Sequence, residues 1–306
     1  MEMSARTLFI GIDGGGSGCR ARIADGDGRV LGEGKATPAA VRLGIDRALA
    51  AVDAAARAAA READLAPEAL ARMHAVVGLA GIGRKSVLAE LDAHRTPFAS
   101  VAWLNDAIIA CVGAHRGRDG GIVIAGTGSV GLALLGGREI RVGGYGFPIS
   151  DEGSGADLGL RAIRLALRAH DGRIAATNLT RAVIAHFGGD PFEAVAFADN
   201  ATATDYAKLA PLVMDHAEAD DPVARTIVAH AAREIEALAT RLAAQGVPRI
   251  ALLGGLAPRL TPWLSADVRR LFVASEGDAL DGALTLARRY AAEGNLNRKG
   301  AEAQSY

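Results

Sequence analysis

The sequence predicts an α/β protein built from two similar halves. Two glycine-rich segments, the first glycine loop at residues 13–17 and the second glycine loop at 125–129, lie 112 positions apart, and each stands between two short apolar runs. A pattern of three strands followed by helices and further strands begins near Leu8 and restarts at Gly120, which indicates an internal repeat. A chain of 306 residues with 50% hydrophobic content has enough apolar area for one large or two medium domains.

The first half has the pattern of a β-meander followed by alternating helices and strands. Glycine turns separate its first three strands, and Asp-Gly-Asp-Gly at 25–28 is the clearest hairpin signal. The predicted strands are 8–12, 19–24, 30–35, 74–79 and 100–104, and the predicted helices are 43–63, 85–93 and 106–114.

The second half begins in the same way and then becomes mainly helical. Helical periodicity runs from Ser154 for almost a hundred residues, with breaks at 170–175, at 188–191 and near Pro222. The predicted strands are 121–126, 129–135, 138–143, 249–253 and 268–273; a last helix covers 278–292, and a polar tail that we expect to be mobile follows from Gly294.

Composition and charge exclude several functions. A net charge of -1, spread over 34 basic and 35 acidic residues, gives no basic face for nucleic acid or an acidic membrane. The two cysteines, Cys19 and Cys111, have no CxxC spacing, and the seven histidines form no HxxH pair, so we expect neither a disulfide framework nor a zinc site. The uncharged stretch 120–137 is too rich in glycine for a membrane helix, and no signal-peptide core precedes the first strand, so we expect a cytoplasmic protein.

The two glycine loops have the composition of a phosphate-binding site. Backbone N–H groups crowded into a turn that lacks Cβ atoms form a concave anion site. Ser17 and Thr127 add hydroxyl donors, and Asp13 stands where a carboxylate can hold Mg²⁺ directly or through water. For either loop alone, an ordinary tight turn is the alternative. Two such loops in one chain favour a polyphosphate such as ATP.

Six segments occur in an order known from one protein family. They are IGIDGGGSGCRARIAD at 10–25, LNDA at 104–107, IAGTGS at 124–129, GGYGFPISDEGSGADLG at 143–159, LLGGLAP at 252–258 and GDALDGAL at 277–284. Together they resemble the N-acetylglucosamine kinase and glucosamine kinase branch of the BadF/BadG/BcrA/BcrD ATPases, in the actin, Hsp70 and sugar-kinase superfamily. The resemblance covers residues 8–290.

The resemblance implies a duplicated ribonuclease-H-like, actin-like ATPase fold with two domains around a nucleotide and sugar cleft. The first domain would cover 1–116 and the second 117–284. A C-terminal helix near 285–295 would pack back on the first domain, and residues 296–306 would form a mobile tail.

The resemblance also implies a function, the phosphorylation of the 6-hydroxyl of an amino hexose, N-acetylglucosamine or glucosamine, with ATP and Mg²⁺. The implied ATP-binding residues are Gly14, Gly15, Gly16, Ser17, Gly126, Thr127, Gly128, Gly254 and Gly255. The implied substrate-binding residues are Asp106, Ser129, Gly144, Tyr145, Gly146 and Asp151, with Asp106 catalytic and Asp13 at the metal. The expected partner is a small-molecule amino sugar, and we expect the protein to bind neither nucleic acid nor a membrane. The resemblance allows a homodimer.

Asp106 is the predicted general base. It follows a strand and begins a helix, so its carboxylate projects from the edge of the sheet where ligands of α/β proteins collect. A sugar hydroxyl needs a proton acceptor as its bond to phosphorus forms, and a placed carboxylate contributes roughly 10²- to 10⁴-fold in rate. From local sequence alone, a helix N-cap is the alternative, and the match to the LNDA motif favours the base.

Asp151 is the predicted sugar-binding carboxylate. It follows the glycine-rich run 143–146, and a carboxylate can accept two sugar hydroxyls at once. An N-cap of the helix that follows is the alternative here too. Gly254 and Gly255 either lie against adenosine, as the resemblance implies, or form an ordinary strand-to-helix turn.

One segment departs from the family pattern. Relatives carry an asparagine that touches the sugar after the third strand, whereas this chain has TPAAVR at 37–42. Alanine cannot replace the paired donor and acceptor of an amide, so the 3- or 4-hydroxyl would be recognised differently, or the sugar would differ. Arg42 either compensates or is solvated.

Three other functions match parts of the sequence. GTGSVG at 126–131 fits the dinucleotide fingerprint, but that fingerprint needs a helix directly after it, where this chain predicts a hairpin. An ATPase activator of a radical dehydratase needs cysteines placed for an iron–sulfur cluster, which Cys19 in a hairpin and Cys111 in a helix do not provide. A non-catalytic sugar sensor on this fold usually has a DNA-binding helix-turn-helix before the first strand, whereas seven residues precede Leu8 in this sequence.

Overall fold

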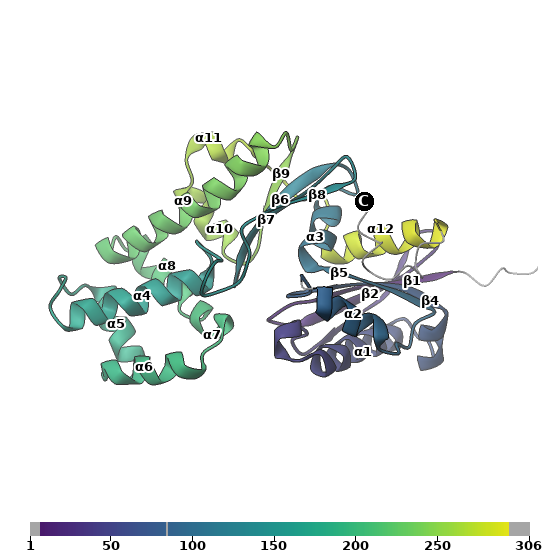
Figure 1. Ribbon diagram of the computed structural model, residues 1–306, viewed down its shortest axis with the longest axis horizontal. Helices are drawn as coiled ribbons and strands as arrows, with labels where there is room; N and C mark the ends of the chain where they lie inside the picture. The colour runs from purple at the N-terminus through teal and green to yellow at the C-terminus, as the bar shows by residue number, and fades with distance from the viewer. Residues whose placement is uncertain (1–6, 84, 294–306) are drawn as a thin grey trace, which may run out of the picture. The chain divides into compact units, whose positions relative to one another are not determined.

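Two five-stranded sheets with the same strand order form the frame of the protein. The structure is a computed structural model that describes residues 7–83 and 85–293 (Figure 1). The first sheet has the order β3-β2-β1-β4-β5 and the second β8-β7-β6-β9-β10. The first contains β1 (Leu8–Gly14), β2 (Cys19–Asp25), β3 (Val30–Ala36), β4 (Met73–Leu79) and β5 (Ser100–Asn105). The second contains β6 (Gly120–Ala125), β7 (Ser129–Leu135), β8 (Arg138–Val142), β9 (Ile250–Leu253) and β10 (Phe272–Val273). The repeated order confirms the internal duplication and the ribonuclease-H-like fold class.

Both sheets are mixed. In the first sheet β1 pairs antiparallel with β2 and β2 with β3, whereas β1 pairs parallel with β4 and β4 with β5. In the second sheet β9 pairs parallel with β6 and with β10. Parallel strands end at the same edge of a sheet, so the loops that follow β1, β4 and β5 meet at one edge.

Helices cover both faces of the first sheet. Figure 1 shows α1 (Ile45–Glu62) and α2 (Lys85–Ala93) on one face and α3 (Asp106–Ala114) and α12 (Ala279–Ala292) on the other. Short 3₁₀ turns lie at Val41–Leu43 and Pro67–Arg72. The chain therefore returns to the first sheet with its last described helix, which packs against α3 and β1.

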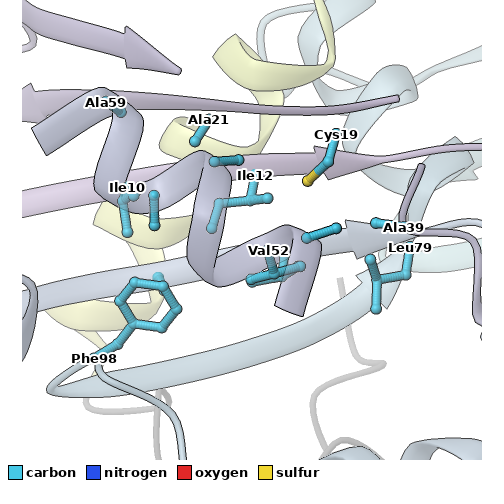
Figure 2. Close-up of a cluster of buried hydrophobic side chains, with 14 of the residues drawn as sticks. Ile10, Ile12, Cys19, Ala21, Ala39, Val52, Ala59, Leu79 and Phe98 are labelled. Carbon is cyan, nitrogen blue, oxygen red and sulfur yellow. The ribbon is translucent and has the colours of Figure 1, made fainter. Parts of the chain in front are cut away.

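Small residues set the distance between α1 and the sheet. The alanine face of α1 lies so close to β3 that a Cβ atom at Gly32 would come within 2.5 Å of the Ala59 carbonyl oxygen, and one at Gly34 would overlap the Ala55 carbonyl oxygen. Larger side chains fill the rest of the interface, where Ile10, Ile12, Val52 and Leu79 are buried (Figure 2). Each such aliphatic side chain contributes about 1.5–3 kcal/mol through burial.

Helices dominate the second half. They are α4 (Gly155–His170), α5 (Asn178–His186), α6 (Pro191–Asn200), α7 (Ala203–Ala207), α8 (Ala210–Glu218), α9 (Pro222–Ala244), α10 (Ala257–Leu260) and α11 (Ala266–Arg269), with a 3₁₀ turn at Thr261–Trp263. The predicted breaks are present, and Asp221 caps α9 ahead of Pro222. Two further breaks, at 201–202 and 208–209, were not predicted; the first carries the capping box of Thr202 and Asp205.

The predicted strand at 268–273 is wrong in most of its length. Residues 266–269 form the helical turn α11, and only Phe272–Val273 pair as a strand. Ser265 is the cause, because its side chain caps α11 by accepting a hydrogen bond from the Val268 N–H. The apolar residues in this segment predict a strand, but the cap that precedes them starts a helical turn.

By contact density the described chain divides into two compact units. The first holds residues 7–120, 132–140 and 274–293, and the second holds 121–131 and 141–273. The domain limits expected from the resemblance, 1–116 and 117–284, stay a prediction. The expected mobile tail lies outside the described residues. Within residues 7–83 and 85–293, no helix has the length and apolarity needed to cross a membrane.

The packing of α12 on α3 gives a test of the fold. A Cβ atom at Gly282 would overlap the Ile109 carbonyl oxygen, so Gly282→Ala should push the two helices apart. We expect this change to lower the free energy of unfolding by about 1–3 kcal/mol, as overpacking does. An exposed helical glycine changed to alanine would instead gain about 0.5–1 kcal/mol. Urea denaturation measures the difference. Thr285→Ala on the same helix is the control, and an unchanged midpoint for Gly282→Ala would contradict the packing described.

Candidate active site

The first glycine loop joins β1 to β2 at the edge where the parallel strands end. The Gly15 N–H donates to the Gly18 carbonyl at 2.9 Å and closes the turn. A Cβ atom at Gly14 would lie 2.5 Å from Leu79 Cδ2 and 2.9 Å from the Ala39 side chain, so only glycine fits there. The loop therefore lies directly on β4 and on the segment after β3.

The segment after β3, which lacks the expected asparagine, packs beneath the first glycine loop. Ala39 and Ala40 are buried, and the Ala39 N–H donates to the Gly15 carbonyl at 3.1 Å. The Ala39 side chain fills the space beneath Gly14, where a longer side chain would displace the glycine loop. Arg42 is exposed. Ala39 thus supports the loop from below.

Asp13, the predicted metal ligand, is paired with Arg20. The Arg20 guanidinium donates to the Asp13 carboxylate at 2.7 Å and lies 3.9 Å from the Asp278 carboxylate. The hydrogen bond to Asp13 is the largest cause that raises the pKa of Arg20. Sequence reasoning missed Arg20, although Asp13 and Arg20 face each other in the β1–β2 register, where opposite charges pair. The Asp13 side chain keeps 21% of its surface exposed.

Asp106 lies at the same sheet edge as the first glycine loop. Gly14 pairs with Leu79, and Leu79 pairs with Asn105, the residue just before Asp106. Asn105 is the N-cap of α3, because its side-chain oxygen accepts from the Ala107 N–H at 2.9 Å. The N-cap interpretation of Asp106 is therefore wrong, although one of its oxygens also lies 3.0 Å from that N–H. Asp106 is the first residue of the helix.

The second glycine loop is held by the first turn of α4. The Gly126 N–H donates to the Gly128 carbonyl at 3.0 Å. The Gly155 N–H donates to the Gly126 carbonyl at 2.8 Å, and the Ala156 N–H to the Thr127 carbonyl at 3.2 Å. These N–H groups have no partner within their own helix, so the loop carbonyls satisfy them. The helix thereby fixes the backbone of the loop.

The turn after β9 lies against the second glycine loop. Gly254 has φ of 101°, and a Cβ atom there would overlap the Ala125 carbonyl oxygen. The Leu256 N–H donates to that same carbonyl at 3.0 Å. A Cβ atom added at Gly255 would have no other atom within 4 Å. Two of the predicted ATP-binding segments, far apart in sequence, thus come together in the second unit.

Asp151 lies beside the second glycine loop in a left-handed conformation. Its φ is 68°, its Oδ1 accepts from the Gly146 N–H at 3.3 Å, and its Oδ2 lies 2.6 Å from a Cβ position built on Gly128. Burial raises the pKa of Asp151, and the backbone N–H groups of Gly146 and Phe147 oppose that rise. The N-cap interpretation is wrong here as well, because Ser154 caps α4. The Ser154–Asp157 spacing is a capping signal that the sequence contained.

Ser129, expected near the sugar, uses its hydroxyl within the protein. The hydroxyl donates to the Glu152 carbonyl at 2.7 Å, and the residue is buried. Its role is therefore to hold the backbone next to Asp151. The Glu152 carboxylate accepts a hydrogen bond from the Ser150 hydroxyl at 3.1 Å.

The loop at 143–150 is held by Arg141. The Arg141 guanidinium donates to the carbonyl groups of Gly143 and Gly144 and lies 5.8 Å from the centre of the Tyr145 ring. Tyr145 itself is 80% exposed. Gly144, with φ of 68°, has no room for a Cβ atom because Val130 lies beneath it. No sequence signal had indicated Arg141.

The structure thus arranges the predicted residues in two groups. Asp13, Gly14, Gly15, Gly16, Ser17 and Asp106 belong to one edge of the first sheet, and Gly126, Thr127, Gly128, Ser129, Gly144, Tyr145, Gly146, Asp151, Gly254 and Gly255 belong to the second unit. The strand β7 begins within the GTGSVG segment, at Ser129, where the fingerprint requires a helix to follow directly, so the dinucleotide-binding alternative is wrong. In the part of the chain that the structure describes, no three His, Cys, Asp or Glu side chains gather as a metal site.

Comparisons with known proteins agree with this arrangement. The profile of the BadF/BadG/BcrA/BcrD ATPase family matches residues 10–287. Glucosamine kinase GspK of Vibrio cholerae is 41% identical over 292 residues, which cover 95% of this chain and 99% of that protein. N-acetyl-D-glucosamine kinase of Dictyostelium discoideum is 27% identical over 76% of this chain and 77% of its own length.

A solved structure shares the fold closely. A candidate N-acetylglucosamine kinase from Chromobacterium violaceum superposes with a TM-score of 0.88 at 36% identity, covering 93% of this chain and 100% of that one. The fold and the two glycine loops define an actin-like ATPase. The chain belongs to the BadF/BadG/BcrA/BcrD ATPase family, whose name implies the use of ATP.

Two adjacent glycines give a matched test of the second glycine loop. We expect Gly254→Ala to lower the free energy of unfolding by about 2–4 kcal/mol, because the new side chain meets the Ala125 carbonyl at a left-handed φ. Gly255→Ala, at a position with open space, should change stability by less than about 1 kcal/mol. Thermal unfolding of both variants checks this. Equal losses would show that the turn after β9 does not support the loop.

Proposed function

We propose that the protein transfers the γ-phosphoryl group of ATP to the 6-hydroxyl of an amino hexose, glucosamine or N-acetylglucosamine. One observation carries the proposal: in each unit, a predicted catalytic or sugar-binding carboxylate lies near a glycine loop. Asp106 shares its sheet edge with the first loop, and Asp151 touches Gly128 of the second. The names of the relatives, a glucosamine kinase and an N-acetylglucosamine kinase, support the substrate class.

The proposed roles follow from the chemistry of each group. The two glycine loops donate backbone N–H groups to phosphate oxygens, which is the charge compensation that phosphoryl transfer needs most. Asp106 accepts the proton of the sugar hydroxyl, and Asp151 accepts hydrogen bonds from other hydroxyls of the same sugar. Gly254 and Gly255 allow the adenosine to lie close to the backbone. Gly144, Tyr145 and Gly146 line the sugar.

The residues near the first glycine loop fit a magnesium ion. Mg²⁺ binds through one or two carboxylates, retained waters and phosphate oxygens, and Asp13 provides a partly exposed carboxylate next to the loop. Arg20 neutralises Asp13 in the structure described. When bound, the ion would neutralise charge on the phosphates, while Asp13 holds it at the end of β1. A cytoplasmic location and a homodimeric state stay predictions.

The cysteines argue against an ATPase activator of a dehydratase. Cys19 and Cys111 are both buried, and burial raises the pKa of each thiol to about 12. Cys19 packs among the side chains beneath α1, and the Cys111 thiol donates to the Gly120 carbonyl at 3.3 Å. A cluster shared between subunits needs cysteines at the protein surface, and both thiols are buried. This alternative is therefore not favoured.

Removal of the base tests the proposal. We expect Asp106→Asn to lower kcat by roughly 10²- to 10⁴-fold with an unchanged fold, because the amide cannot accept the proton. A coupled assay of ADP release with glucosamine, N-acetylglucosamine, glucose and N-acetylmannosamine measures both the loss and the preferred sugar. Asp46→Asn, in the first turn of α1, is the matched control and should keep full activity.

Other outcomes of that assay separate the alternatives. ATP hydrolysis that needs no sugar and survives Asp106→Asn would point to an activator. Sugar binding without turnover in the unmodified protein would point to a sensor. Full activity in Asp106→Asn would remove Asp106 as the base.

The pKa of Asp151 gives a pH prediction. Sugar binding needs the carboxylate form, so kcat/KM for the sugar should fall as the pH drops through the raised pKa of Asp151. Glu152 raises that pKa and Arg141 lowers it. Arg141→Gln should therefore move the acid limb to higher pH, and the same change made together with Asp151→Asn should leave the limb where Asp151→Asn alone puts it. Profiles measured at saturating ATP check this, and a limb that moves equally with Arg141→Gln whether or not Asp151 is present would contradict it.

A further inference from the structure

Asp157 is a buried carboxylate that the roles above do not use. It lies in the first turn of α4, and its exposed fraction is 9%. Its Oδ2 accepts from the Gly153 N–H at 3.0 Å, and the Arg161 Nε lies 2.9 and 2.8 Å from its two oxygens. A buried carboxylate is costly unless it is paired and hydrogen-bonded, and Arg161 and Gly153 provide both.

The turn that Asp157 contacts is strained. Asp151 and Gly153 both have positive φ, 68° and 75°, a region that is unfavourable for a residue with a Cβ atom such as Asp151. The Ser154 N–H donates to the Asp151 carbonyl at 3.2 Å and closes the turn. Such a conformation persists only where surrounding groups hold it. Two do so from outside the turn: Ser129 at the Glu152 carbonyl and Asp157 at the Gly153 N–H.

The hydrogen bond of Asp157 differs from that of an ordinary capping box. In a capping box the third helical residue accepts from the N–H of the N-cap, as in α5, α7 and α12. Asp157 is the third residue of α4, yet it accepts from Gly153, which precedes the N-cap Ser154. Its side chain therefore constrains the turn that carries Asp151.

We infer that Asp157, charge-paired with Arg161, is a positioning residue that holds Asp151 in its left-handed conformation beside Gly128. The inference rests on the proposed function, because Asp151 is there the acceptor for the sugar. Asp157 would act on sugar binding through Asp151 and not through contact with the sugar. The second glycine loop has separate support from the Gly155 and Ala156 N–H groups, so ATP binding should depend little on Asp157.

The test compares substitutions at Asp157 with a matched control. We expect Asp157→Ala to raise KM for the sugar at least about tenfold, with KM for ATP within about twofold, because the misplaced carboxylate loses oriented hydrogen bonds. Asp157→Asn keeps an acceptor for the Gly153 N–H and should restore most of the sugar affinity. The control is Thr180→Ala. Thr180 is the third residue of α5, as Asp157 is of α4, and its loss from the capping box of α5 should lower Tm without moving KM for the sugar or for ATP.

Hydrogen–deuterium exchange gives a readout that does not need turnover. Peptides covering 146–154 should exchange faster in Asp157→Ala than in the unmodified protein, with unchanged exchange in β6 and β9. If the unmodified protein phosphorylates no amino sugar, the proposed function fails, and the exchange data alone decide the positioning role. If Asp157→Ala only lowers Tm, as Thr180→Ala does, and leaves sugar KM and exchange at 146–154 unchanged, the inference is overturned. If the alanine variant does not fold, Asp157→Leu, which keeps the approximate shape of the side chain but removes the acceptor of the Gly153 N–H, decides by the same two measurements.

Discussion

Each glycine loop depends on hydrogen bonds that its carbonyl groups accept from segments elsewhere in the sequence. The last residue of β1, Gly14, accepts from the Ala80 N–H at 2.9 Å, and the last residue of β6, Ala125, accepts from the Leu256 N–H at 3.0 Å. Both donors lie just after the fourth strand of their half. Buried backbone carbonyls need partners, so these bonds leave the loops little freedom. The duplication is therefore preserved in the bonds that shape the loops as well as in the strand order.

The two halves differ in what surrounds this shared support. In the first half, the segment after β3 lies beneath the glycine loop, and its Ala39 side chain packs against Gly14. In the second half, α4 begins at the loop and supplies its first two N–H groups as donors. The same helix start places Ser154 and Asp157 around the turn of Asp151. In the second unit, the start of α4 thus contacts both the glycine loop and the turn that carries Asp151.

Much of this could be predicted from sequence because the signals were local. Glycine turns, apolar runs and the restart at Gly120 predicted the two halves and most of their strands, and the helices at 85–93 and 106–114 were predicted with the observed ends. Contacts that form only in the folded protein could not be predicted in that way. The pairing of Arg20 with Asp13, the Arg141 hydrogen bonds and the contact of Gly254 with Ala125 depend on folded geometry. The error at 268–273 came from a cap, Ser265, that was present in the sequence. The caps Asn105 and Ser154 were present there too, and they exclude the N-cap alternatives for Asp106 and Asp151.

The central proposal is that both glycine loops bind phosphate groups of ATP. Backbone amide NMR of ¹⁵N-labelled protein, titrated with a non-hydrolysable ATP analogue, tests it most directly. The account predicts large shifts at the amides of residues 14–17 and of 126–129, with one shared dissociation constant. Saturable binding that shifts the amides of only one loop would contradict it.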